Sequence, residues 1–133
     1  MDYAFSIALN QPAGRRDMET WVGDDFDVVA KLYAADGDAD PITDYTGKVV
    51  TLVVGRHWTP PGATITGMPD VDGNVTFDMS GVDWSRYWGL VPWQMKLADG
   101  SRNKTVAEGY IVVYGNTAPC AWPNDYGFGW GGW

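Results

Sequence analysis

The sequence predicts an all-β fold, a sandwich or barrel of antiparallel strands. Apolar and polar residues alternate over short runs such as "FDVVAKLY" and "VPWQMKL", which is the period of a strand with one buried face. Turn-forming segments such as "ADGDADP" and "DVDGN" separate these runs at intervals of about ten to twenty residues. No stretch of a dozen residues shows the helical period, and 133 residues suit one domain.

The alternating runs assign an inward face to each expected strand. "KVVTLVV", residues 48–54, is apolar at nearly every position, so we expect a central strand covered on both faces. "KTVAEGYIVVY", residues 104–114, is the last long strand, with a β-bulge expected at Gly109. Residues 81–90 should form one short turn that carries the chain between sheets. The inward positions are Tyr3, Phe5, Ile7 and Leu9; Phe26, Val28, Ala30 and Leu32; Val75, Phe77 and Met79; and Val91, Trp93, Met95 and Leu97.

The chain divides into an expected sandwich domain, residues 1–118, and an aromatic, glycine-rich tail, residues 119–133. A segment so rich in glycine loses much backbone entropy on ordering, so a partner or the core must hold it. We predict that its rings are interface anchors. These are Trp122, Tyr126, Phe128, Trp130 and Trp133. A secondary interaction surface is predicted at Trp84, Tyr87 and Trp88, a cluster whose rings are also suited to plug the open end of a sandwich.

The net charge of −8 is local, because residues 17–44 hold nine acids and one base while the rest of the chain is neutral. Nucleic-acid binding needs clustered Lys and Arg, which are absent from the sequence, so we expect no nucleic-acid partner. The N-terminus does not fit a secretion signal, and no run approaches the roughly 20 apolar residues of a membrane span. We expect a soluble protein made in the cytoplasm.

Few residues suit catalysis or metal binding. The chain has one histidine, His57, and one cysteine, Cys120, too few for a zinc site, and no nucleophile-elbow motif accompanies a serine. Asp36, Asp38 and Asp40 have the spacing of calcium ligands, but the glycine and glutamate of an EF-hand loop are missing. We interpret them as a soluble turn, and leave cation binding there open. No cofactor, metal or small-molecule substrate is predicted.

Five motifs follow one another within residues 20–117: "GDD", "PITDYTG", "DGNVTF", "YWGLVPWQMKLADG" and "TVAEGYIVV". In this order they resemble the immunoglobulin-like modules of bacteriophage virion proteins, notably the N-terminal domain family of the baseplate upper protein. The resemblance implies a structural role in a phage particle, in an oligomeric ring or a fibre attachment. It offers no catalytic residues to carry over. The length suits a small stand-alone virion protein of the head, tail or baseplate.

We therefore expect an immunoglobulin-like antiparallel β-sandwich of about seven or eight strands that acts as a non-enzymatic virion structural and assembly protein. Its expected partners are other virion proteins and further copies of itself, with no membrane. Two alternatives stay open. One is a carbohydrate-binding module that uses exposed Trp and Tyr rings. The other is a carboxylate-dependent glycosidase, for which only Asp27, Asp78 and Glu108 fall inside expected strands.

Overall fold

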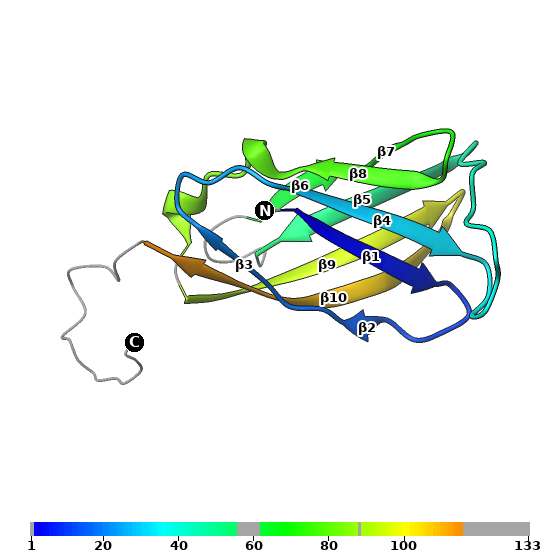
Figure 1. Ribbon diagram of the computed structural model, residues 1–133, viewed down its shortest axis with the longest axis horizontal. Helices are drawn as coiled ribbons and strands as arrows, with labels where there is room; N and C mark the ends of the chain where they lie inside the picture. Colours follow the sequence, from blue (N-terminus) through cyan, green and yellow to red (C-terminus); the bar gives the residue numbers. More distant parts are fainter. Residues whose placement is uncertain (1, 56–61, 88, 116–133) are drawn as a thin grey trace.

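The computed structural model describes residues 2–55, 62–87 and 89–115 (Figure 1). Within these residues the chain forms ten strands and two 3-10 helices. In chain order they are β1 (Tyr3–Ala8), β2 (Gly14–Arg15), β3 (Met18–Trp21), β4 (Asp27–Tyr33), β5 (Lys48–Val54), β6 (Ala63–Thr66), β7 (Met68–Pro69), β8 (Asn74–Asp78), η1 (Met79–Gly81), η2 (Trp84–Arg86), β9 (Gly89–Asp99) and β10 (Arg102–Tyr114).

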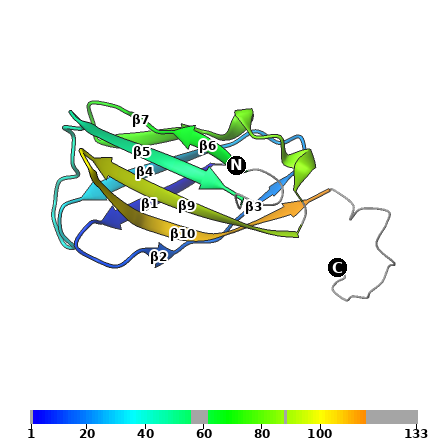
Figure 2. The same ribbon diagram turned by 180° about the vertical axis from the view of Figure 1, so that it is seen from behind.

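The strands form two sheets that lie face to face (Figures 1 and 2). Sheet A has the order β1-β4-β8-β7. Sheet B has the order β2-β10-β9-β5-β6, and β3 also pairs with β10. If β4 is taken as strand B of an immunoglobulin domain, β8 and β7 take the places of E and D, and β10, β9 and β5 those of G, F and C. The two facing sheets confirm the predicted all-β sandwich, and their strand order is similar to that of an immunoglobulin domain.

The sequence had led us to expect an antiparallel sandwich, but some of the strand pairs are parallel. β1 runs parallel to β4, and both β2 and β3 run parallel to β10. Strands joined by a hairpin must be antiparallel, but the chain passes from β1 in sheet A to β2 and β3 in sheet B before it returns to β4, which removes that constraint. The structure also describes more strands than the seven or eight expected. The strands β2 and β7 have two residues each, which is too short to show the alternation from which strands were predicted.

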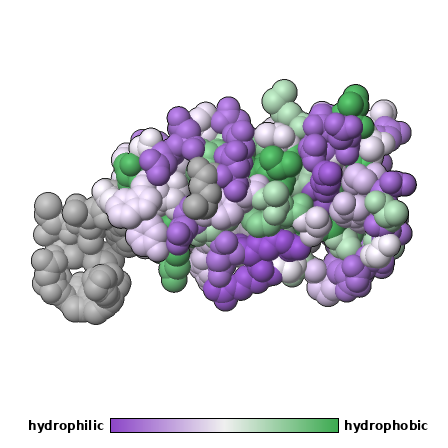
Figure 3. Space-filling model, in the orientation of Figure 1, coloured by the Kyte–Doolittle hydropathy of each residue, from purple (hydrophilic) through white to green (hydrophobic). Residues whose placement is uncertain are grey.

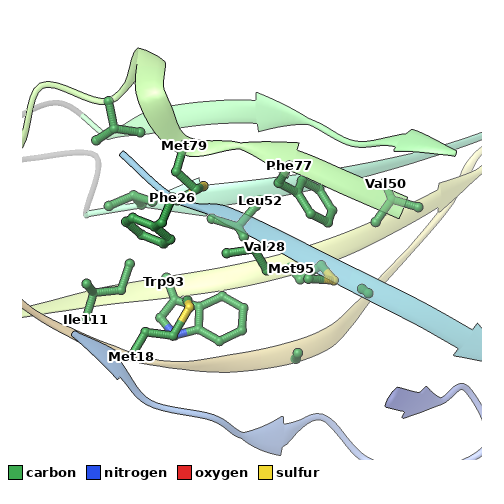
Figure 4. Packing of buried hydrophobic residues seen from close by; sticks show 14 of the residues in the cluster. Met18, Phe26, Val28, Val50, Leu52, Phe77, Met79, Trp93, Met95 and Ile111 are labelled. Atoms are coloured by element: carbon green, nitrogen blue, oxygen red, sulfur yellow. The ribbon is translucent and has the colours of Figure 1, made fainter. Parts of the chain in front are cut away.

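The hydrophobic core fills the space between the sheets, and Figure 4 shows its side chains projecting from both. The inward positions predicted within residues 26–32, 75–79 and 91–97 are all buried. Those predicted within residues 3–9 are buried at Ile7 and pack at the margin of the core at Tyr3, Phe5 and Leu9. Trp93, at 1% exposure, places its ring in the core and donates its indole N–H to the carbonyl oxygen of Arg16 at 2.9 Å.

The β5 strand is covered on one face only, which corrects the prediction of burial on both. Val50, Leu52 and Val54 point into the core and are at most 3% exposed. Val49, which points outward, is 48% exposed. Its apolar sequence misled because β-branched residues favour any strand, and they do so whether or not a second layer covers them.

The bulge in β10 is also displaced from its expected place. The register with β9 shifts between Thr105 and Ala107, so the extra residue is Val106 and not Gly109. Gly109 serves another purpose: a Cβ atom there would lie 2.6 Å from the carbonyl carbon of Arg16, and closer still to its oxygen. Glycine at this position lets the segment between β2 and β3 approach the β10 backbone.

The crossover from β8 in sheet A to β9 in sheet B runs through two 3-10 helices, η1 and η2, where one short turn was expected. Trp84 and Tyr87 are only 4% and 5% exposed, and the Trp84 ring stacks on Phe26 with 5.8 Å between centroids. They therefore plug the sandwich and do not form the predicted secondary surface, because burial of rings this large stabilises the end of the core. Trp88 lies outside the described residues. No helix in the described part of the chain is long and apolar enough to cross a membrane.

Candidate functional site: the outer face of sheet B

Four outward side chains gather where β10 ends on the outer face of sheet B: Trp21, Leu90, Val112 and Tyr114. We call them the aromatic patch. The β-register pairs Tyr114 with Trp21 of β3 and Val112 with Leu90 of β9, so the four come from three adjacent strands. On β10, the residues next to Val112 and Tyr114 point into the core, so the side chains of Val112 and Tyr114 face outward.

The aromatic patch is exposed although its members are large and apolar. Trp21 is 57% exposed, Leu90 65% and Tyr114 38%. The Trp21 and Tyr114 rings lie 5.1 Å apart between centroids, so they form one surface. Gly115 follows with a φ of +84°, and a Cβ there would lie 3.2 Å from the Trp21 ring. Glycine thus allows the chain to turn closely past Trp21.

One carboxylate borders the aromatic patch. The Tyr114 hydroxyl donates a long hydrogen bond of 3.4 Å to Oε2 of Glu19, which pairs with Val112 in the sheet. The negative charge of Glu19 raises the pKa of Tyr114, so the phenol stays neutral over the physiological range. Figure 3 shows the side of the molecule seen in Figure 1, where hydrophilic residues cover much of the surface and hydrophobic ones lie among them.

A hollow of about 570 Å³ lies beside the aromatic patch on the same face. Its lining includes four polar or charged side chains from β2, β9 and β10 together with the Tyr110 ring and Pro92. The four are Arg15, Gln94, Lys96 and Glu108. The hollow is therefore chemically different from the aromatic patch, although β9 and β10 carry parts of both.

An exposed ion pair lies at one wall of the hollow. Arg15 donates through Nε to both carboxylate oxygens of Asp17 at 3.2 Å, and its guanidinium lies 5.1 Å from the centroid of the Tyr110 ring. Asp17 also accepts the backbone N–H of Tyr110 at 3.0 Å. The hydrogen bond from Arg15, and then that from Tyr110, lower the pKa of Asp17. Asp17 thus connects Arg15 with the backbone of the strand that carries Tyr110.

The predicted tail anchors, Trp122, Tyr126, Phe128, Trp130 and Trp133, lie outside the described residues, as do His57 and Cys120. In the "DGDAD" loop, Asp38 accepts the backbone N–H of Ala35 at 3.1 Å, and the backbone N–H of Asp36 bonds to Asn10. Within the described ranges, no three His, Cys, Asp or Glu side chains come together as a metal site would need. The Asp38 carboxylate thus stabilises the loop locally.

The carboxylates considered for glycoside hydrolysis are divided between the sheets. Asp27 and Asp78 are register partners in sheet A, whereas Glu108 faces outward from sheet B. Asp78 accepts hydrogen bonds from Ser80, which lower its pKa. A general acid requires a raised pKa, so Asp78 is poorly suited to that role.

The patch and the hollow were not found from the sequence. Trp21, Arg15 and Tyr110 were not singled out as candidate residues. A signal existed in the outward positions of the same alternating runs, since Leu90 and Tyr114 are large apolar residues at positions that alternation assigns to solvent. No protein-family model matches this sequence, and no curated protein is significantly similar to it.

Proposed function

We propose that this chain is a non-enzymatic structural protein that docks onto other proteins of a larger assembly through the aromatic patch. The supporting observation is that Trp21, Leu90 and Tyr114 are exposed side by side on a rigid sheet. Clustered exposed rings are typical of protein interfaces, where Trp and Tyr contribute most of the binding free energy. The sandwich behind them limits the conformational entropy that docking costs.

We further propose that the assembly is a bacteriophage particle, made in the host cytoplasm, in which the chain has a tail, baseplate-like or head accessory position. The order of the sequence motifs within residues 20–117 supports this, and the immunoglobulin-like strand order agrees with it. Its partners are then other virion proteins and further copies of the chain. The five tail aromatics are additional anchors, and repeated weak contacts gain strength by avidity in a symmetric assembly.

The patch is tested in the phage or prophage that carries the gene, by complementing a deletion with variants and analysing purified particles by quantitative mass spectrometry. Leu90→Glu places a charge in the aromatic patch and should deplete the protein from particles by about tenfold or more. The matched control is Val71→Glu, because Val71 is 89% exposed and lies away from sheet B. It should be incorporated like the wild type.

Two outcomes would count against the proposal in different ways. If the wild-type protein is absent from particles, the virion role is wrong. If both variants are incorporated equally, the aromatic patch is not the docking surface. Deleting residues 122–133 should leave a folded, soluble domain that assembles poorly, as circular dichroism and particle analysis would show; a truncated protein that unfolds would mean that the tail belongs to the core.

A further inference from the structure

We infer that the hollow beside the aromatic patch is a binding site for a neutral saccharide. This inference concerns a ligand site separate from the proposed docking surface and does not depend on it. The residues that carry it are Arg15, Gln94, Lys96, Glu108 and Tyr110, all of which line the hollow.

The sheet register brings the polar groups into one row. Glu108 of β10 lies directly between Arg15 of β2 and Gln94 of β9. Lys96 stands two residues along β9 on the same outward face. Opposed positions of an antiparallel pair, such as Glu108 and Gln94, have Cβ atoms about 5 Å apart, and Arg15 and Lys96 line the same hollow beside them.

These groups have unused hydrogen-bonding capacity. Within the described residues, the side chains of Gln94, Lys96 and Glu108 make no hydrogen bond or ion pair. Lys96 can only donate, ionised Glu108 can only accept, and Gln94 does both. A sugar hydroxyl also does both, and a pyranose carries several of them around its ring. The mixture of donors and acceptors therefore matches a polyol better than a ligand with acceptors alone.

An aromatic ring and apolar surface stand next to this polar row. Tyr110 is partly exposed, the Arg15 guanidinium lies over its ring, and Asp17 accepts its backbone N–H. Pro92, its register partner, and Val53 add apolar surface to the lining. A pyranose presents C–H groups on its ring faces and hydroxyls at its edge, so it can use both parts at once. Binding sites for small molecules commonly combine apolar walls with a few fixed polar groups in this way.

The charges in and beside the hollow favour a neutral ligand. Arg15 and Lys96 are balanced by Asp17 and Glu108, and the whole chain carries −8. A phosphate, sulfate or uronate group would be repelled by Glu108 and by the net negative charge of the whole chain. The volume of about 570 Å³ lies within the range of roughly 300–1,000 Å³ usual for ligand sites.

The test uses the full chain and three neutral probes, maltohexaose, cellohexaose and chitohexaose, with heparin hexasaccharide as the anionic comparison. Binding is detected by saturation-transfer NMR and quantified by calorimetric titration. We expect at least one neutral probe to bind with a millimolar or lower Kd. Tyr110→Ala and Glu108→Gln should each raise the Kd of that probe by about tenfold or more. Tyr114→Ala is the matched control, because it removes a ring from the same strand and face but outside the hollow, and its Kd should equal that of the wild type.

Several results would overturn the inference. They are the absence of binding by all three neutral probes up to about 10 mM, tighter binding of heparin hexasaccharide, or an unchanged Kd in both hollow variants. Should Tyr110→Ala fail to fold, Glu108→Gln decides alone, since it preserves the size of an exposed side chain. Leu90→Glu separates the two proposals: it should abolish docking but leave saccharide affinity unchanged, so either proposal can fail without the other.

Discussion

Replacing Gly109 by alanine tests how the N-terminal segment is attached to sheet B. The new Cβ would lie 2.6 Å from the carbonyl carbon of Arg16, below the 3.0 Å that real Cβ contacts respect. The neighbour is backbone, so it cannot rotate aside as a side chain can. The segment must therefore move away from β10. This movement breaks two hydrogen bonds of the Arg16 backbone.

Those hydrogen bonds set the expected cost. The Arg16 N–H donates to the Glu108 carbonyl at 2.7 Å, and the Arg16 carbonyl accepts the buried indole N–H of Trp93 at 2.9 Å. Losing both costs about 2 kcal/mol, and overpacking adds about 1–3 kcal/mol. Gly109→Ala should therefore lower the free energy of unfolding by about 3–5 kcal/mol, and the Tm by about 10–20 °C.

Thermal and urea unfolding followed by circular dichroism measure this loss. Gly81→Ala is the matched control, because Gly81 has no atom within 4 Å of the position that its Cβ would take and no positive φ. It should change the free energy of unfolding by less than about 0.5 kcal/mol. If Gly109→Ala costs less than about 1 kcal/mol, the close approach of the two backbones is wrong.

Three further changes test packing and charge. Leu52→Ala should cost about 2–5 kcal/mol in urea unfolding because Leu52 is fully buried, whereas Val49→Thr should cost less than about 0.5 kcal/mol. Gly67→Ala should cost about 1–3 kcal/mol in the same assay, since a Cβ there would meet buried side chains of β8. Asp17→Asn should flatten the acid dependence of stability measured by urea unfolding at several pH values. The hydrogen bond from Arg15 lowers the folded-state pKa of Asp17, so this carboxylate stabilises the fold above its unfolded pKa of about 3.9 and loses that contribution as the pH falls through the lower folded value.

Each of these predictions has a contrary result. Equal losses for Leu52→Ala and Val49→Thr would mean that both faces of β5 are covered. A neutral Gly67→Ala would show that the core relaxes around the added methyl group. An Asp17→Asn variant whose stability falls as steeply as that of the wild type below about pH 4 would show that Asp17 is not the acid-sensitive group.

The sequence by itself determined which residues face the core. Val28, Phe77 and Met95 were placed inward from alternation alone, and all are buried. Burial can be predicted from a short run because successive side chains of a strand point to opposite faces. The alternation within a few residues therefore shows which side chains face inward. The same pattern could not show whether a second layer covers the outward face, which is why β5 was misjudged.

Only the tertiary structure decided which distant residues meet. Tyr110 contacts Asp17 across 93 positions of sequence, and the parallel pairing of β3 with β10 brings Trp21 beside Tyr114. The sequence likewise shows that Gly109 is a glycine within a strand, which is unusual. The reason, the close approach of the Arg16 backbone, is visible only in the structure. Alternation fixes the face that a side chain occupies, whereas the neighbours on that face follow from strand order and register, which depend on contacts throughout the chain.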